Sequence, residues 1–98
     1  MLLIRDIMYC KPGQVRPMVD KFLAVAKLSE KHNLGTMRIL TDVSAERFWT
    51  LVIEVETPSL EAFMNMGDSE VMKEFETLMK GYHDYVDSGR REIYTIEA

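Results

Sequence analysis

The stretch from Arg47 to Glu56 reads RFWTLVIEVE and carries the strongest strand signal in the chain. β-Branched and aromatic residues fill it, and its charges stand at its two ends. A strand with one apolar and one mixed face is central in its sheet and covered on both sides. The apolar parity is Trp49, Leu51, Ile53 and Val55, and the mixed parity is Phe48, Thr50, Val52, Glu54 and Glu56.

Further elements are predicted around this strand from hydrophobic periodicity and turn residues. An apolar stripe at helical spacing follows the Lys11-Pro12-Gly13 turn, and Ser44-Ala45-Glu46 is short enough for a hairpin into the central strand. After Thr57-Pro58, a helical segment is interrupted at Gly67 and capped by Gly89. The predicted strands are 2–10, 36–43, 47–56 and 90–97, and the predicted helical segments are 14–31 and 57–89.

This β-α-β-β-α-β order is the ferredoxin-like arrangement, so we expect one α+β domain over residues 1–98. A right-handed crossover places the strands before and after the first helix on either side of the central strand. The result is a four-stranded antiparallel sheet with both helical segments on one face. The core between them is expected to include Trp49, Leu51, Ile53, Phe22, Phe63, Phe75 and Leu78.

The opposite face of this sheet is too apolar to be left in water, which predicts a second copy packed sheet against sheet. Arg5, Arg38 and Glu54 share that face, either as an ion-pair cluster that fixes the register of a dimer or as an anion site. The apolar residues of the face are Leu3, Ile7, Tyr9, Leu40, Phe48 and Val52. The expected dimer interface includes Arg5, Arg38, Phe48, Val52 and Glu54.

Composition narrows the possible functions. A net charge of −4 argues against nucleic-acid binding, and no apolar run approaches the roughly 20 residues of a membrane span. Cys10 is alone, which rules out an intrachain disulfide and favours the cytoplasm. No metal-ligand spacing and no glycine-rich phosphate loop is present, so we expect neither a metal nor a cofactor.

Three stretches resemble the dimeric α/β-barrel superfamily, which includes antibiotic-biosynthesis-monooxygenase-like, NIPSNAP-like and stress-responsive barrel proteins. They are Lys11-Pro12-Gly13-Gln14, the strand from Phe48 to Glu56, and Ser59-Leu60-Glu61-Ala62-Phe63. The resemblance implies two sheets that form a barrel across a dimer, and a small pocket in each subunit between sheet and helices. Members of the superfamily oxidise aromatic polyketides, degrade haem, isomerise lactones or have no known activity.

His83 is the titratable side chain best suited to chemistry, either as a general base or as an iron ligand of the kind seen in haem-binding relatives. A surface histidine near a helix end is the alternative. We expect Tyr82, Tyr85 and Met66 to line the pocket, and Trp49 either to stack on an aromatic ligand or to fill the core. His32 is expected at a helix C-terminus, where a cation interacts favourably with the helix dipole.

Two functions follow from these observations. The first is a small homodimer whose sheet–helix pocket binds an apolar or aromatic molecule. The second is a cofactor-independent monooxygenase-like enzyme that acts on an aromatic metabolite. A haem-handling protein and a regulatory ligand-binding module are further alternatives.

Overall fold

The computed structural model describes residues 1–65 and 69–98. Its sheet has the strand order β2-β3-β1-β4, and all three strand pairs are antiparallel. The elements are β1 (Leu2–Cys10), α1 (Val15–Lys31), β2 (Met37–Thr41), β3 (Thr50–Thr57), α2 (Leu60–Met64), α3 (Ser69–Met79), a 3-10 turn η1 (Tyr82–Asp84) and β4 (Val86–Thr95). The ferredoxin-like prediction is confirmed, with β3 between β1 and β2.

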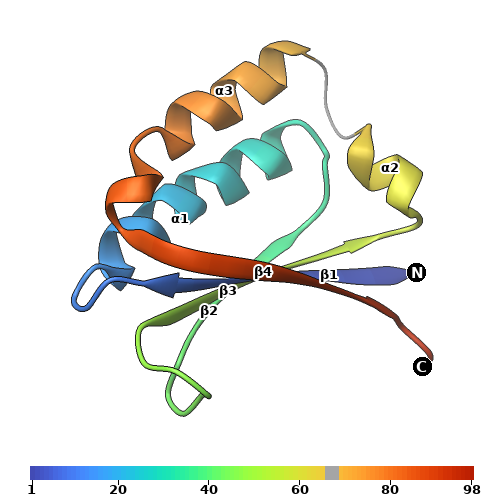
Figure 1. Cartoon of the computed structure of the whole chain (residues 1–98). Helices are drawn as coiled ribbons and strands as arrows, with labels where there is room; N and C mark the ends of the chain where they lie inside the picture. Colours follow the sequence, from blue (N-terminus) through green and yellow to red (C-terminus); the bar gives the residue numbers. More distant parts are fainter. Residues whose placement is uncertain (66–68) are drawn as a thin grey trace.

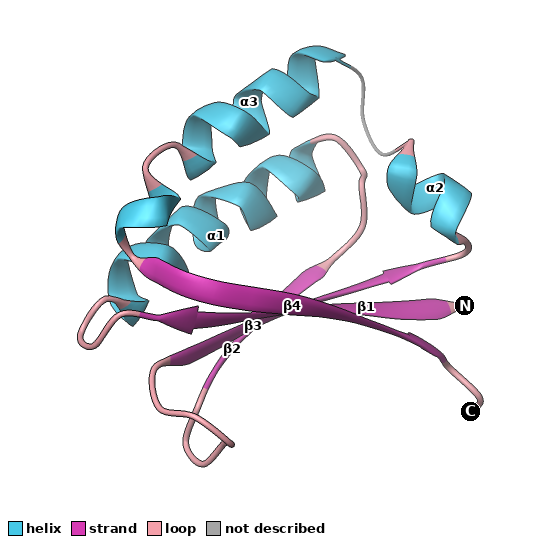
Figure 2. Ribbon diagram, in the orientation of Figure 1, coloured by secondary structure: helices cyan, strands magenta, loops and turns pink. Residues whose placement is uncertain are grey.

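The helices lie together on one face of the sheet, and no helix of the described chain covers the other face (Figure 1). The connection between β2 and β3 lies against part of that face, where the Arg47 guanidinium is 4.2 Å from the centroid of the Tyr9 ring. Figure 2 shows the same two layers, with α1 and α3 side by side above the strands. The buried core lies between these layers because β3 turns Leu51 and Ile53 towards α1, which contributes Met18 and Val19. Burial of such side chains contributes about 1.5–3 kcal/mol each.

Trp49 does not belong to β3 or to the helix-facing core, and the sequence-based prediction was wrong there. Its φ of 60° is left-handed, and its side chain is 44% exposed. Thr50 holds the bend from both of its polar groups, since its N–H donates to Asp42 Oδ1 at 2.9 Å and its hydroxyl donates to the Arg47 carbonyl at 2.8 Å. Such local side-chain bonds compete with the extended ladder.

The connection between β2 and β3 is consequently residues 42–49 rather than a three-residue hairpin. β2 also ends two residues earlier than expected, at Thr41. Phe48 lies in this connection and is 86% exposed, so it is not a residue of the sheet face.

The second helical segment differs from the prediction at both ends. Ser59 is the N-cap of α2, and its hydroxyl accepts from the Ala62 N–H at 3.1 Å, whereas Thr57 is the last residue of β3. α3 ends at Met79, and Gly81 takes the left-handed conformation with φ 83°. Gly89 is therefore not a helix cap but a residue of β4, paired with β1. The predicted interruption at Gly67 lies outside the described residues.

Candidate ligand-binding site

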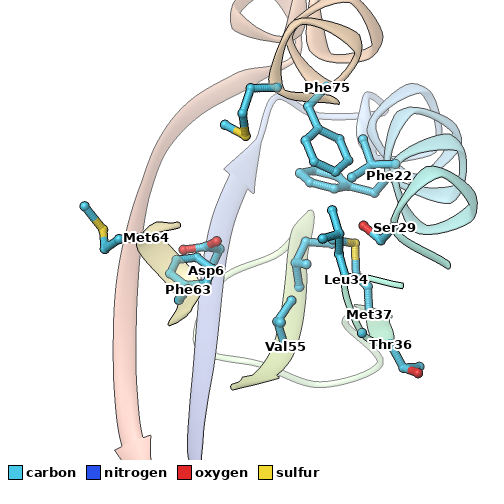
Figure 3. A pocket seen from close by; sticks show the side chains of 14 residues that line it. Asp6, Phe22, Ser29, Leu34, Thr36, Met37, Val55, Phe63, Met64 and Phe75 are labelled. Carbon is cyan, nitrogen blue, oxygen red and sulfur yellow. The ribbon is translucent and has the colours of Figure 1, made fainter. Parts of the chain in front are cut away.

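A cavity of about 330 Å³ lies between the helix-facing side of the sheet and the three α-helices (Figure 3). Aromatic side chains line it from each helix: Phe22 from α1, Phe63 from α2 and Phe75 from α3. Aliphatic and methionine side chains complete the walls: Val25, Leu34, Met37, Ile53, Val55, Met64 and Met72. The cavity is thus a mainly apolar space bordered by the sheet and by all three of these helices.

Of the described residues that line this cavity, Asp6 is the one with an acidic side chain. It belongs to β1 and pairs in register with Ile53 of β3 and Arg91 of β4, which puts its carboxylate on the helix-facing side. Arg91 binds it in a bidentate manner, with Nε 2.6 Å from Oδ1 and Nη2 3.2 Å from Oδ2. This hydrogen bonding raises the pKa of Arg91 above its ordinary range, against an opposing effect of burial.

The ion pair stands at the edge of the cavity rather than deep inside it. The Asp6 side chain is 33% exposed and that of Arg91 is 50% exposed. The Arg91 guanidinium lies 5.2 Å from the centroid of the Phe63 ring, a cation–π distance. In Figure 3, Asp6 lies beside Phe63, with Ser29 on the α1 side of the cavity. Ser29 is buried and, with Thr36, supplies the side-chain hydroxyls of the lining.

The residues predicted for the pocket lie elsewhere. Tyr82 and Tyr85 pack against the core cluster around Cys10 and do not line this cavity. His83 is exposed on η1, with its ring centroid 3.9 Å from that of Tyr82, and also lies outside the cavity. Met66 is outside the described residues.

Trp49 lines a different hollow, near the Cys10 end of β1, where its carbonyl accepts from the Cys10 N–H at 2.9 Å. The other residues of that hollow are Gly13, Val15, Arg16, Thr41, Asp42 and Phe48. The ligand-binding roles predicted for Trp49, Tyr82, Tyr85 and Met66, and the catalytic role of His83, stay predictions, and the four that are described do not meet in one cavity.

The sequence does hold a signal for the actual lining. Asp6 is a charged residue on the helix-facing parity of β1, where its neighbours of the same parity, Ile4 and Met8, are apolar. An acidic group at such a position requires a partner and marks a place where the core is not continuous. The three lining phenylalanines were predicted in the core between the sheet and the helices, and they do lie on that side of the sheet.

The predicted charge cluster is present on the opposite face. Glu54, 8% exposed, lies between Arg5 at 3.0 Å and Arg38 at 2.5 Å. Glu92 extends the row, since it lies 3.4 Å from both Arg5 and Arg90. The cluster therefore links all four strands within one chain, and its role in a dimer stays a prediction.

His32 is at the C-cap of α1 as expected, and its Nε2 lies 3.5 Å from a carboxylate oxygen of Glu74 on α3. His32 thus lies between α1 and α3. No described residues group as three or more histidine, cysteine or acidic side chains that could hold a metal ion. Within the described chain, none of the helices has the length and apolar character needed to cross a membrane.

No protein-family model and no curated protein sequence matches this chain. Solved structures do match it. An uncharacterised NIPSNAP-like domain protein from Burkholderia xenovorans is 12% identical, with a TM-score of 0.77 over 99% of this chain and 85% of that one. An antibiotic biosynthesis monooxygenase is 14% identical, with a TM-score of 0.74 over 100% of both chains.

A putative antibiotic biosynthesis monooxygenase from Bacteroides thetaiotaomicron is 12% identical, with a TM-score of 0.73 over 99% of this chain and 90% of that one. These neighbours fit the resemblance that the sequence motifs indicate. At such identities the similarity establishes the fold, which is the ferredoxin-like α+β fold of NIPSNAP-like and antibiotic-biosynthesis-monooxygenase-like proteins.

Proposed function

We propose that this chain is a homodimeric ligand-binding protein that holds a small apolar or aromatic molecule in the cavity between sheet and helices. The observation that carries the proposal is the cavity itself, about 330 Å³ with three phenylalanines in its walls. Small-molecule sites in proteins are concave, mainly apolar and provided with a few polar groups that orient the ligand. Asp6, Ser29 and Thr36 are such groups.

Thermal unfolding with α-naphthol tests the binding. A ligand that binds only the folded state stabilises it by about 2.7 kcal/mol at a concentration of 100 Kd. In a domain of this size each kcal/mol corresponds to about 4–8 °C in Tm. We expect α-naphthol to raise the Tm of the wild type and to give a saturable heat in calorimetry.

A cavity-filling variant shows where the molecule binds. Val55→Phe adds a ring to a cavity wall, and it should abolish the Tm increase while the protein stays folded. Val43→Phe makes the same chemical change at a fully exposed position and should leave the increase intact. Equal binding by both variants would place the ligand elsewhere.

The homodimer is supported by the face of the sheet that no helix of the described chain covers. Leu40, which is paired with Val52 of β3, and Tyr94, which is paired with Leu3 of β1, are substantially exposed there. A second copy packed with the same sheet face against this one would remove the apolar surface from water. Burial of such a surface is what drives two sheet faces to pack together.

A second candidate is a cofactor-independent monooxygenase, favoured by the full-length match to the antibiotic biosynthesis monooxygenase structure. The corresponding reaction would convert α-naphthol and O₂ into the para-quinone and water. The substrate supplies the electrons, one oxygen atom enters the ring, and the other leaves as water. An oxygen electrode measures consumption by wild type and by His83→Ala. Loss of turnover in the variant would support the predicted role of His83, and no consumption by wild type would reject the candidate.

A further inference from the structure

Asp6 is an unusual choice for its position in the fold. The helix-facing positions of β1 on either side of it are Ile4, which is buried, and Met8, which packs against the core cluster. Replacing a partly buried ion pair by apolar residues is often neutral or stabilising, so the pair with Arg91 is not explained by stability alone. The position calls for an account of what the carboxylate does in the cavity.

The two members of the ion pair face different surroundings. Asp6 lines the cavity, whereas Arg91 does not, and the guanidinium is held over the Phe63 ring instead. A molecule in the cavity would therefore meet an oxygen acceptor and not the guanidinium donors. The arginine acts on such a molecule only by holding the carboxylate in place.

The carboxylate also has unused hydrogen-bonding capacity. An ionised carboxyl group offers about four lone-pair positions on its two oxygens. Arg91 takes one position on each oxygen, and no other side chain or backbone N–H of the described residues donates to Asp6. Each oxygen can accept one more hydrogen bond.

We infer that Asp6 is the specificity-determining residue of the cavity and selects ligands that carry a hydroxyl group, such as phenols and naphthols. The inference rests on the proposed function and names its class of ligand. The apolar walls hold the ring system, and the hydroxyl donates to the Asp6 carboxylate. A hydrogen bond to a charged acceptor is stronger than a neutral one, and a ligand without the donor would leave the acceptor unpaired. The carboxylate has no proton to donate, so a ligand that carries only acceptors gains no hydrogen bond from it.

Three ring compounds of similar size show whether the ligand donates a hydrogen bond to the cavity, accepts one from it, or does neither. α-Naphthol has a donor, α-methoxynaphthalene has an acceptor but no donor, and α-methylnaphthalene has neither. Calorimetry on the wild type should show α-naphthol binding about tenfold or more tightly than the other two, which should bind alike. If α-methoxynaphthalene binds as tightly as α-naphthol, a protein donor dominates and the inference is overturned.

Variants of Asp6 test the residue directly. Asp6→Leu should bring the three affinities to within about threefold of one another and leave α-methylnaphthalene bound at least as well as by the wild type. Asp6→Asn keeps one acceptor oxygen and a similar shape, so it should fold if the leucine variant does not, and its preference should be intermediate. Asp20→Leu, the same change at an exposed position of α1, should keep the full preference.

The outcomes distinguish the two proposals. A preference for α-naphthol that persists in Asp6→Leu or is undiminished in Asp6→Asn overturns the role of Asp6. Equal binding of all three compounds by the wild type overturns the selection for a hydroxyl while the ligand-binding function stands. Binding of none of them by the wild type overturns the proposed function itself, and the inference with it.

Discussion

At Gly89 the backbones of β4 and β1 approach too closely for a side chain. A Cβ added there would lie 2.9 Å from the carbonyl oxygen of Ile7, which is part of the strand ladder and cannot swing away. Gly→Ala inside a strand normally stabilises by about 0.5–1 kcal/mol. We expect Gly89→Ala instead to lower the free energy of unfolding by about 1–3 kcal/mol.

Urea denaturation measures that change, and Ser88→Ala is the matched control. Ser88 is the exposed neighbour on the same strand, so its loss should change stability by less than about 0.5 kcal/mol. A Gly89→Ala protein as stable as the wild type would mean that β4 is displaced from the position described above.

Cys10 is buried beside α1, and its chemistry follows from that burial. Burial raises the pKa of the thiol, and the carboxylates of Asp42 and Asp87 raise it further. We expect the native protein to react with a disulfide reagent far more slowly at neutral pH than the urea-unfolded protein does. Rapid labelling of the native protein would show that the end of β1 opens readily.

The same shift has a consequence for alkaline stability. In the pH range between the unfolded and the folded pKa, the folded thiol keeps a proton that the unfolded thiol has lost. The free energy of unfolding therefore falls as pH rises above the ordinary thiol range. Cys10→Ala should show a shallower alkaline decline than the wild type in urea titrations at a series of pH values.

Trp49 shows which residue-scale features cannot be anticipated from a pattern. Alternating hydrophobicity assigns it to the apolar parity with Leu51, but a positive φ breaks the alternation one residue before the strand. Such a φ is rare for a bulky residue. One of the two Thr50 hydrogen bonds that hold this bend is accepted by Asp42, across the connection, and sequence periodicity carries no information about that contact.

At the scale of elements, the order of strands and helices was predictable because each has a strong period of its own. The register of β1, β3 and β2 placed Arg5, Glu54 and Arg38 in one row, as their shared parity indicates. The residues at which the elements end were predicted less well. α3 ends ten residues before Gly89 because Gly81 supplies a left-handed turn first, and η1 then redirects the chain into β4.

The cavity could not be predicted from the order of helices and strands alone. Phe22, Phe63 and Phe75 were assigned to the correct layer, but the space between them depends on how three helices are placed over one sheet. Leu51, by contrast, is fully buried in the continuous core. The two regions should respond differently to truncation.

We expect Leu51→Ala to cost more than Phe75→Ala, although phenylalanine is the larger side chain. Leu51 leaves a new void in a packed region, at about 2–5 kcal/mol. Phe75 is half-buried and borders an existing cavity, so its loss should cost less, about 1–2 kcal/mol. Paired urea titrations give both values, and the reverse order would mean that the cavity closes around Phe75 in solution.

On the scale of the whole molecule, the two faces of the sheet have different tasks. The helix-facing side holds the core and the cavity, whereas the other side carries the charge row and exposed apolar groups within one chain. The row from Arg38 through Glu54 and Arg5 to Glu92 is paired internally, so it does not need a second copy for neutrality. A dimer through this face would be driven by its apolar residues and aligned by its charges.

A substitution at Val52 is the most direct test of the sheet-to-sheet dimer. This residue of β3 is paired with Leu40 of β2 and with Ile7 of β1 on the face concerned. The wild type should have twice the chain mass of 11.4 kDa in light scattering at micromolar concentration. Val52→Lys places a charge in the apolar part of the face, where burial without a partner is costly, and should yield the monomer with reduced stability. Val43→Lys, the same change at a fully exposed residue of the β2–β3 connection, should remain dimeric. If the wild type is instead a soluble and stable monomer at micromolar concentration, its open face does not need a second copy. The proposal of a sheet-to-sheet dimer would then be wrong.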